Sequence, residues 1–267
     1  FHRPLRPERM SIFRFWMLRP FRQRARNAVN RVTQPPIGAP SRLKPSQLVE
    51  WFEDACNEGP QLIGTEHEKF GVAFDADLGT FAPIDFERHV QPMMADLVAR
   101  HGWKPGDDRG TGGEIVALAR DNASVTLEPG GQLELSGAPF RTIHETCAEF
   151  SAHQIELDDV ARRHGVTLIA SGFHPFATRE QIHWMPKGRY GVMREYLPTR
   201  GARALDMMTR TATVQANFDY KDEVDCGRRL RLAASLTPAL VAMFANSPYR
   251  DGRHHGVRSE RSAVWEE

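Results

Sequence analysis

The spacing of hydrophobic and polar residues along the chain predicts an irregular alternation of helices and strands. Apolar residues recur at helical spacing in some segments, whereas short alternating or continuous apolar runs bounded by turn residues predict strands. Helices are predicted over residues 41–58, 89–103, 142–164, 222–245 and the later part of 185–198. Strands are predicted within residues 62–74, 114–121, 124–137, 166–173 and 211–220, and the closing SAVWEE is strand-like. This irregular order with short connections favours an α+β fold with an antiparallel sheet over a doubly wound parallel fold.

Three of the predicted strands carry polar side chains at every second position. Residues i and i+2 of a strand share a face, so Glu66 and Glu68 point the same way in TEHEKFG. Gln132 and Glu134 likewise share a face in GGQLELSG, and Glu128 stands just before the turn that precedes them. In the last strand, the polar face holds Thr213, Gln215, Asn217 and Asp219, opposite Val214, Ala216 and Phe218. Each of these strands therefore offers one apolar face for helices and one polar face.

Two interpretations of the polar faces remain open from the pattern alone. A sheet side that faces solvent would show the same alternation. Acids and amides dominate here, however, and carboxylates that converge on one face repel one another unless a cation screens them. Hard oxygen ligands of this kind suit Mg²⁺, which commonly accompanies nucleotide phosphates. The second interpretation is therefore a Mg²⁺ or Mg–nucleotide site.

Basic residues form a second group of candidates. Arginine binds carboxylates and phosphates in a bidentate manner, and lysine neutralises phosphate as a point charge. The group comprises Lys187, Arg189 and Arg194 in MPKGRYGVMREY, Arg210 before the last polar strand, and Arg258 and Arg261 around RSERSAVW. Each residue alone is typical of a protein surface. Combined with an acidic metal-binding face, they predict a phosphoryl-transfer pocket for an anionic substrate.

Length and composition exclude several other classes of protein. The chain has 267 residues with 40% apolar content, enough for one large domain or two small ones, and lacks an apolar window of about 18 residues that could span a membrane. Three scattered cysteines argue against a disulfide scaffold or a zinc site. P-loop, GxSxG and HExxH motifs are absent, so no protein nucleophile or common metalloprotease site is indicated.

The near-neutral net charge of +1 hides a basic N-terminus and an acidic body. Residues 1–44 hold eleven Lys and Arg against one acid, Glu8, which leaves an excess of acids in residues 45–267. That distribution argues against a nucleic-acid-binding domain, in which the folded face carries the positive charge. We expect residues 1–44 to be a disordered extension. A plastid transit segment is the alternative to the cytoplasmic location that we expect.

Several long blocks of sequence resemble glutamate–cysteine ligases of the plant and proteobacterial type. The blocks run in consistent order from about residue 45 to residue 267. They are GTEHEKFGV (64–72), LEPGGQLELSGAP (127–139), HETCAEF (144–150), MPKGRYGVMREYLP (185–198), LDMMTRTATVQANFDY (205–220) and FANSPYRDG (244–252). The resemblance implies a fold like that of glutamine synthetase and the guanidino kinases: an antiparallel sheet forms a funnel with helices on its outer face, and its polar side binds Mg²⁺ and ATP.

The resemblance also implies an activity. ATP phosphorylates the γ-carboxylate of L-glutamate, and the amine of L-cysteine displaces phosphate to give γ-glutamylcysteine, the first step of glutathione biosynthesis. A related ligase with another amine acceptor, or an inactive fragment of the family, is the alternative. The family is longer than this chain, so we expect residues 45–267 to form a catalytic domain without its C-terminal portion. Cys147 matches a cysteine of a regulatory disulfide in plant members, and its partner would lie beyond residue 267.

Family roles carry over to individual residues of this chain as expectations. The metal carboxylates should be Glu66, Glu68, Glu128 and Glu134, with Gln215 and Asn217 nearby. Stabilisation of phosphate or acyl phosphate is expected of Lys187 and Arg189. Binding of the glutamate carboxylates is expected of Arg210 with Arg258 or Arg261. The cysteine pocket should be lined by Tyr190 and Met185.

Overall fold

The computed structural model describes residues 44–266, and these form two compact units. One unit contains the described residues up to Gln61 together with Asn217–Leu230. The other contains Leu62–Ala216 together with the residues from Arg231 onwards. Apart from Lys44, the extension predicted for residues 1–44 lies outside the described residues.

The smaller unit joins α3 (Pro45–Glu53) to the segment that follows β8 (Val214–Phe218). The backbone N–H of Asn57 donates to the carbonyl of Tyr220 at 2.9 Å. The Asn57 amide also donates to Asp219 Oδ2 at 2.9 Å, and the Tyr220 hydroxyl donates to the carbonyl of Phe52 at 3.1 Å. Pro45 at the first turn of α3 suits a helix start, but the helix ends at Glu53, five residues before the predicted end.

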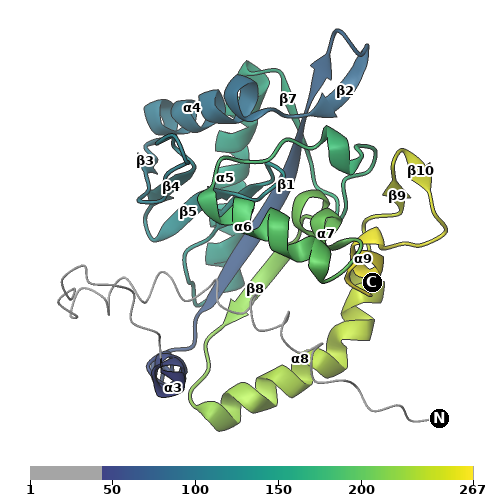
Figure 1. Ribbon diagram of the computed structural model, residues 1–267. Coiled ribbons are helices and arrows are strands. Elements are labelled where there is room, and N and C mark those ends of the chain that lie inside the picture. Colours follow the sequence, from purple (N-terminus) through teal and green to yellow (C-terminus); the bar gives the residue numbers. More distant parts are fainter. Residues whose placement is uncertain (1–43, 267) are drawn as a thin grey trace. The chain divides into compact units, whose positions relative to one another are not determined.

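Among the described residues, strands β1–β8 form one sheet. Its path runs β2-β1-β6-β5-β4-β3, and β7 and β8 also pair with β1 (Figure 1). The strand pairs along this path, and the pair of β1 with β7, are antiparallel, which confirms the α+β prediction. The strands are β1 (Ile63–Asp75), β2 (Thr80–Pro83), β3 (Lys104–Pro105), β4 (Ala117–Arg120), β5 (Ala123–Leu127), β6 (Leu133–Ser136), β7 (Val166–Ile169), β8 (Val214–Phe218), β9 (Tyr249–Arg250) and β10 (Arg253–His254).

The helices follow most of the predicted segments. Beyond α3 they are the π-helix η2 (Phe86–Val90), α4 (Gln91–His101), α5 (Ile143–Arg163), η3 (Arg179–Gln181), α6 (Gly188–Tyr196), η4 (Leu197–Thr199), α7 (Ala204–Arg210), α8 (Glu223–Phe244) and α9 (Glu260–Glu266). The ends of α5 have clear local causes. Thr142 caps its N-terminus in a capping box with Glu145, and Gly165 has a φ of +66° just beyond its C-terminus. Within the described part of the chain, no helix combines the length and apolar character needed to cross a bilayer.

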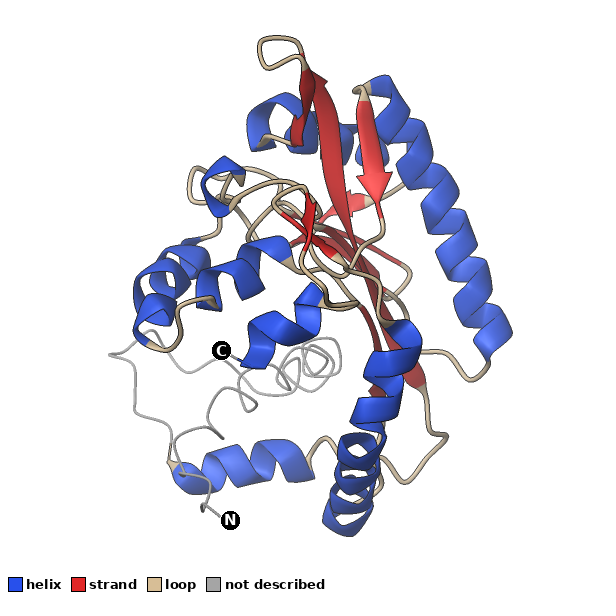
Figure 2. Cartoon of the chain, turned by 90° about the vertical axis from the view of Figure 1, so that its right-hand side faces the viewer, coloured by secondary structure: helices blue, strands red, loops and turns tan. Residues whose placement is uncertain are grey.

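The main hydrophobic core lies between the sheet and helices α4 and α5. Leu127, Leu133 and Leu135 from the sheet are almost fully buried, together with Leu97 of α4 and Leu157 of α5. Figure 2 shows the long helix α5 along one side of the strands, with shorter helices on the other side. The apolar positions of β5 and β6 thus face helices, as the alternation predicts.

Two sequence-based predictions about secondary structure were wrong or incomplete. The closing SAVWEE was predicted as a strand, but its residues 262–266 lie in α9, where Val264 is buried and packs against Phe173 and Met207. Residues 204–210 were not predicted as a separate helix, yet they form α7, whose C-terminal half is buried. The short α7 has too few turns to show helical periodicity in the sequence.

The expectation that helices cover the apolar face of the last polar strand was also wrong. In β8, Val214 is 63% exposed and Phe218 is 60% exposed. The predicted helix 222–245 is present as α8, but its leucines are exposed too: Leu230, Leu232, Leu236 and Leu240. Alternation in β8 and periodicity in α8 therefore gave the correct element types, but the apolar side chains of both lie on the surface of the described structure.

Candidate functional site

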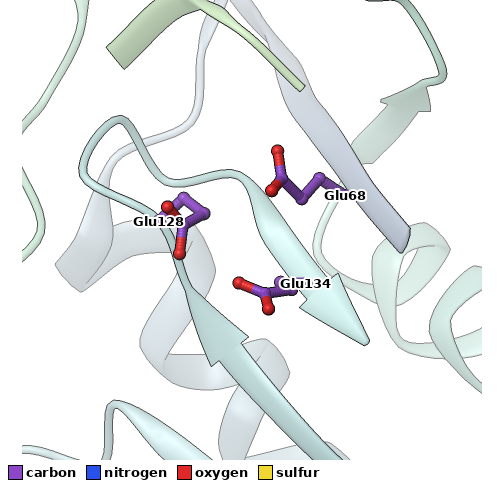
Figure 3. A group of neighbouring side chains, drawn as sticks. All are labelled: Glu68, Glu128 and Glu134. Atoms are coloured by element: carbon purple, nitrogen blue, oxygen red, sulfur yellow. The ribbon is translucent and has the colours of Figure 1, made fainter. Parts of the chain in front are cut away.

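Three glutamates converge at one point of the sheet. Glu68 comes from β1, Glu134 from β6, and Glu128 follows the last residue of β5 (Figure 3). One ligand oxygen from each lies within 4.8 Å of the others. All three carboxylates are nearly inaccessible, with exposed fractions of 4% for Glu68 and Glu128 and 2% for Glu134. They are three of the four acids that the sequence analysis expects to lie together; the fourth is Glu66.

The register of the sheet forces two of these carboxylates together. Glu68 and Glu134 are direct partners in the antiparallel pair β1–β6. Like charges directly opposite each other in a sheet are destabilising, and burial strengthens the repulsion. The arrangement therefore favours either protonation of one carboxyl or a bound cation, and the oxygen-only donor set suits a hard divalent cation such as Mg²⁺.

Neighbouring donors orient the cluster. The hydroxyls of Ser136 and Thr126 donate to the two oxygens of Glu134, at 2.8 and 3.2 Å. The backbone N–H of Thr213 donates to Glu68 Oε2 at 3.1 Å, and the N–H of Glu68 donates to the Thr213 carbonyl at 2.9 Å. These donors fix the directions in which the oxygens of Glu68 and Glu134 point.

Glu66 lies on the same face of β1 but outside the group of three. Its exposed fraction is 5%, and its Oε2 accepts a hydrogen bond of 2.5 Å from Gln215 Nε2. The structure thus brings Gln215 beside a predicted metal carboxylate, as expected from the facing polar strands. Asn217 belongs to the smaller unit and is half-buried there.

The segment before α6 and the first turn of that helix bring together Met185, Lys187 and Tyr190. All three are buried, and they contribute to the lining of a cavity of about 240 Å³ that also contacts Arg194. Lys187 Nζ lies 3.5 Å from Asp108 Oδ2 in the glycine-rich loop 106–113, and the N–H of Thr111 in that loop donates to the Pro186 carbonyl at 2.8 Å. The loop thereby holds the buried Lys187 side chain at the cavity.

The Tyr190 hydroxyl is directed at the backbone of the sheet. It donates to the Leu127 carbonyl at 2.5 Å, one residue before Glu128. Arg189 stacks on the Tyr190 ring with 5.0 Å between guanidinium and ring centre, and its Nη2 donates to the Tyr190 hydroxyl at 3.2 Å. Tyr190 therefore supports the strand end next to Glu128, in addition to lining the cavity.

The three predicted carboxylate-binding arginines have different surroundings. Arg210 is buried, with Nη1 3.4 Å from Asp206 and Nη2 2.5 Å from Asp251. Arg258 is exposed. Arg261 of α9 is half-buried; burial lowers the pKa of its guanidinium, and the charge of Glu68 opposes that shift. Its Nη1 has no hydrogen-bond partner among the described residues, and the same is true of Arg210 Nε, so each of these two arginines has an N–H group left for an added anion.

Some residues of the site were not assigned a role from sequence. Ser136, Thr126 and Thr213 donate to the carboxylates, and Asp108 contacts Lys187. Gln132 was recognised as sharing a face with Glu134, but the sequence gave no indication of its hydrogen bonds. These contacts join segments far apart in the chain, so alternation along one strand could not reveal them.

A buried carboxylate cluster on an antiparallel sheet is typical of enzymes that bind a divalent cation together with phosphates. A sequence profile described as "Glutamate-cysteine ligase family 2(GCS2)" matches residues 62–267. This chain belongs to that family.

Curated relatives support the same assignment. The chain is 39% identical over 234 residues to "Glutamate--cysteine ligase, chloroplastic" of Medicago truncatula, covering 87% of this chain and 44% of the relative. It is 38% identical over 234 residues to the Arabidopsis thaliana protein of the same name, covering 87% and 43%. It is 42% identical over 224 residues to "Glutamate--cysteine ligase B, chloroplastic" of Oryza sativa subsp. japonica, covering 84% and 44%. The chain thus spans less than half the length of these relatives.

Proposed function

We propose that the chain is part of a glutamate–cysteine ligase that joins the γ-carboxylate of L-glutamate to the amine of L-cysteine at the expense of ATP. The observation that carries the proposal is the buried trio Glu68, Glu128 and Glu134 in a member of this family. ATP and Mg²⁺ are the proposed co-substrate and cofactor. Glutamine synthetase-like funnel geometry is the proposed arrangement of the sheet around them.

The trio would hold Mg²⁺, with Glu66 adjacent. The donor set fits a hard cation, because it offers oxygen atoms alone and two of its members are forced into opposition by the β-sheet. When bound, Mg²⁺ supplies neutralisation of the charge on the phosphoryl oxygens during transfer. The sheet itself fixes the carboxylates in place, while Ser136, Thr126 and Thr213 orient their oxygens.

The basic side chains would bind the anionic substrates and stabilise the charge on the transferring phosphoryl group. Lys187 and Arg189 are proposed to stabilise the transferring phosphoryl group and the acyl phosphate. Arg261, with Arg210 and Arg258, is proposed to bind the glutamate carboxylates; the structure favours Arg261, because Arg210 already has two carboxylate partners. Met185 and Tyr190 are proposed to line the cysteine pocket, and Gln215 to lie on its polar side. The role of Asn217, which belongs to the smaller unit, stays a prediction.

The proposed chemistry balances without a protein nucleophile. A γ-carboxylate oxygen of glutamate attacks the terminal phosphorus of ATP, and the bond to ADP breaks. The cysteine nitrogen then attacks the acyl carbon, loses a proton, and phosphate departs as the carbon–oxygen bond breaks. Lys187 and the arginines contribute by positioning and charge stabilisation, the main sources of acceleration in phosphoryl transfer.

Mass spectrometry of the products tests the proposal. The chain would be incubated with glutamate, Mg–ATP and a panel of amine acceptors, and we expect γ-glutamylcysteine to form when cysteine is present. A different γ-glutamyl product would transfer the assignment to the related ligase with another acceptor. Absence of product with this chain, but formation of γ-glutamylcysteine by a longer one, would identify this chain as an inactive fragment of the family.

The cellular location is part of the same proposal. The cytoplasmic location expected from the sequence gains no support from the relatives, because their names describe them as chloroplastic. Those names fit the plastid alternative. Fusion of residues 1–44 to a fluorescent protein would distinguish the two, because a transit segment should direct the fusion to plastids and a plain extension should leave it in the cytoplasm.

A further inference from the structure

The side chain of Gln132 is fully engaged with backbone groups of two separate segments. Its exposed fraction is 1%. Oε1 accepts a hydrogen bond of 2.9 Å from the N–H of Gly130. Nε2 donates to the Thr211 carbonyl at 2.7 Å and, more weakly, to the Met208 carbonyl at 3.4 Å. One buried carboxamide thus links the turn after β5 to the C-terminal end of α7.

Each of the linked segments holds a carboxylate of the trio. The turn begins at Glu128, whose N–H donates to the Gln132 carbonyl at 2.9 Å. The other segment continues from Thr211 to Thr213, whose N–H binds Glu68 Oε2. Gln132 is therefore the side-chain bridge between the backbone that carries Glu128 and the backbone that contacts Glu68.

The two segments also approach each other very closely. A Cβ atom built on Gly130 would lie 2.1 Å from the Thr209 carbonyl oxygen, a distance that requires glycine at this position. Gly131 has a φ of +83° and lies against Met185. Because the two segments lie so close together, loss of the Gln132 hydrogen bonds would leave the N–H of Gly130 and the carbonyl of Thr211 buried without those partners, which is unfavourable.

We propose that Gln132 is a positioning residue that clamps the Glu128 turn to the Met208–Thr213 segment and so fixes the spacing of the three carboxylates. The proposal rests on the metal site of the proposed function. A carboxylate site binds a divalent cation well when its oxygens are held at the required separation before the cation arrives. Gln132 itself need not touch the cation, because it acts through Glu128 and Glu68.

The test compares Gln132→Met with Leu133→Met. Both variants place the same apolar side chain at adjacent buried positions, but Leu133 faces the hydrophobic core and makes no polar contact with the turn. Mn²⁺ binding, followed by electron paramagnetic resonance at a temperature at which both variants are folded, reports the affinity of the carboxylate site, which depends on the carboxylate spacing. Amide hydrogen exchange in residues 128–131 reports the clamp without any metal.

We expect Gln132→Met to weaken Mn²⁺ binding at least about tenfold and to accelerate exchange in the turn, and Leu133→Met to change the affinity less than about twofold. Wild-type affinity in Gln132→Met would overturn the proposal, because it would reduce Gln132 to a packing residue. If Gln132→Met does not fold, Gln132→Asn, whose amide falls one methylene short of its partners, is judged by the same thresholds.

The outcomes also separate this proposal from the proposed function. Wild-type protein that fails to bind Mn²⁺ would contradict the metal site. The clamp would still be judged by hydrogen exchange. Exchange in the turn that is faster than in wild type for Gln132→Met, but unchanged for Leu133→Met, would support the clamp. Equal exchange rates in the two variants would overturn it.

Discussion

The two faces of β1 carry different kinds of ionisable side chain, acids on one and bases on the other. On one face, Glu66 and Glu68 meet hydrogen-bond donors and further acids. On the other, Lys69 Nζ lies 3.2 Å from His67 Nδ1, and burial lowers the pKa of Lys69 to about 8 and that of His67 to about 4. The acids thus meet hydrogen-bond donors, whereas burial drives the two bases toward their neutral form.

This difference separates a binding face from a packing face. The basic face is covered by α5, where buried His153 stacks edge-on against Trp103, and burial lowers the pKa of His153 to about 3. Neutral imidazoles fit such an interior, and no added ligand is needed. Opposed carboxylates on the acidic face need either a counter-charge or protonation of one of them. The alternating sequence TEHEKF therefore supplies the acids of the proposed cation site on one face of β1 and residues packed in the interior on the other.

The largest expected effect is a loss of turnover on substitution of an acid on the acidic face of β1 or on its partner strand. Glu134→Gln or Glu68→Gln should lower Mg²⁺-dependent turnover by about two orders of magnitude or more, because one of the opposed ligands loses its charge. Thermal unfolding should stay cooperative, since removal of one negative charge relieves repulsion. Steady-state kinetics with glutamate, cysteine and Mg–ATP measures the effect, and near-normal turnover in both variants would remove the argument for a metal-binding face.

Substitution in the turn that carries Glu128 should have the next largest effect. In Gly130→Ala the new methyl group meets the Thr209 carbonyl at 2.1 Å, so we expect a loss of about 2–4 kcal/mol in the free energy of unfolding. Gly191→Ala is the matched control. Its Cβ would meet no atom within 4 Å in the middle of α6, so it should stabilise by about 0.5–1 kcal/mol. Urea unfolding measures both, and equal effects would contradict the close approach.

Buried His153, next to the basic face of β1, predicts that the free energy of unfolding is sensitive to acid. Below about pH 6.5 the unfolded chain protonates His153, whereas the folded chain does so near pH 3, so the free energy of unfolding falls as the pH drops. One such histidine contributes a slope of about 1.4 kcal/mol per pH unit between these limits. His153→Gln should make the decline between pH 6 and 4 shallower by about that amount, and stability should be unaffected by this group above pH 7.5. Urea unfolding across this range tests it; an unchanged slope would place His153 in a wetter environment.

The smallest expected effect concerns the helix that covers the basic face. Thr142 Oγ1 accepts from the N–H of Glu145 at 3.3 Å, and Glu145 Oε2 accepts from the N–H of Thr142 at 3.0 Å. Thr142→Ala removes the first of these bonds and should cost about 1 kcal/mol. Turnover measured at a temperature at which the variant is folded should be unchanged. A large loss of turnover would mean that the two faces of the sheet are coupled.

The sequence allowed the sheet, its polarity and the position of the acids to be predicted, because these depend on periodicity within single strands. Glu68 and Glu134 were placed on a polar face by alternation, and the register of β1 with β6 brings them together. The environment of Arg210 could not be predicted in this way, because its partner Asp251 lies 41 residues away along the chain. The exposure of Val214 was also unpredictable, since alternation identifies an apolar face but not what covers it.

The most direct test of the central claim is Mn²⁺ binding by the wild-type chain and by Glu134→Gln, with Glu145→Gln in the capping box as a surface control. We predict saturable binding by wild type that Mg²⁺ displaces, retained by Glu145→Gln and weakened at least about a hundredfold by Glu134→Gln. Binding of equal strength in all three proteins would contradict the claim that Glu68, Glu128 and Glu134 form the cation site.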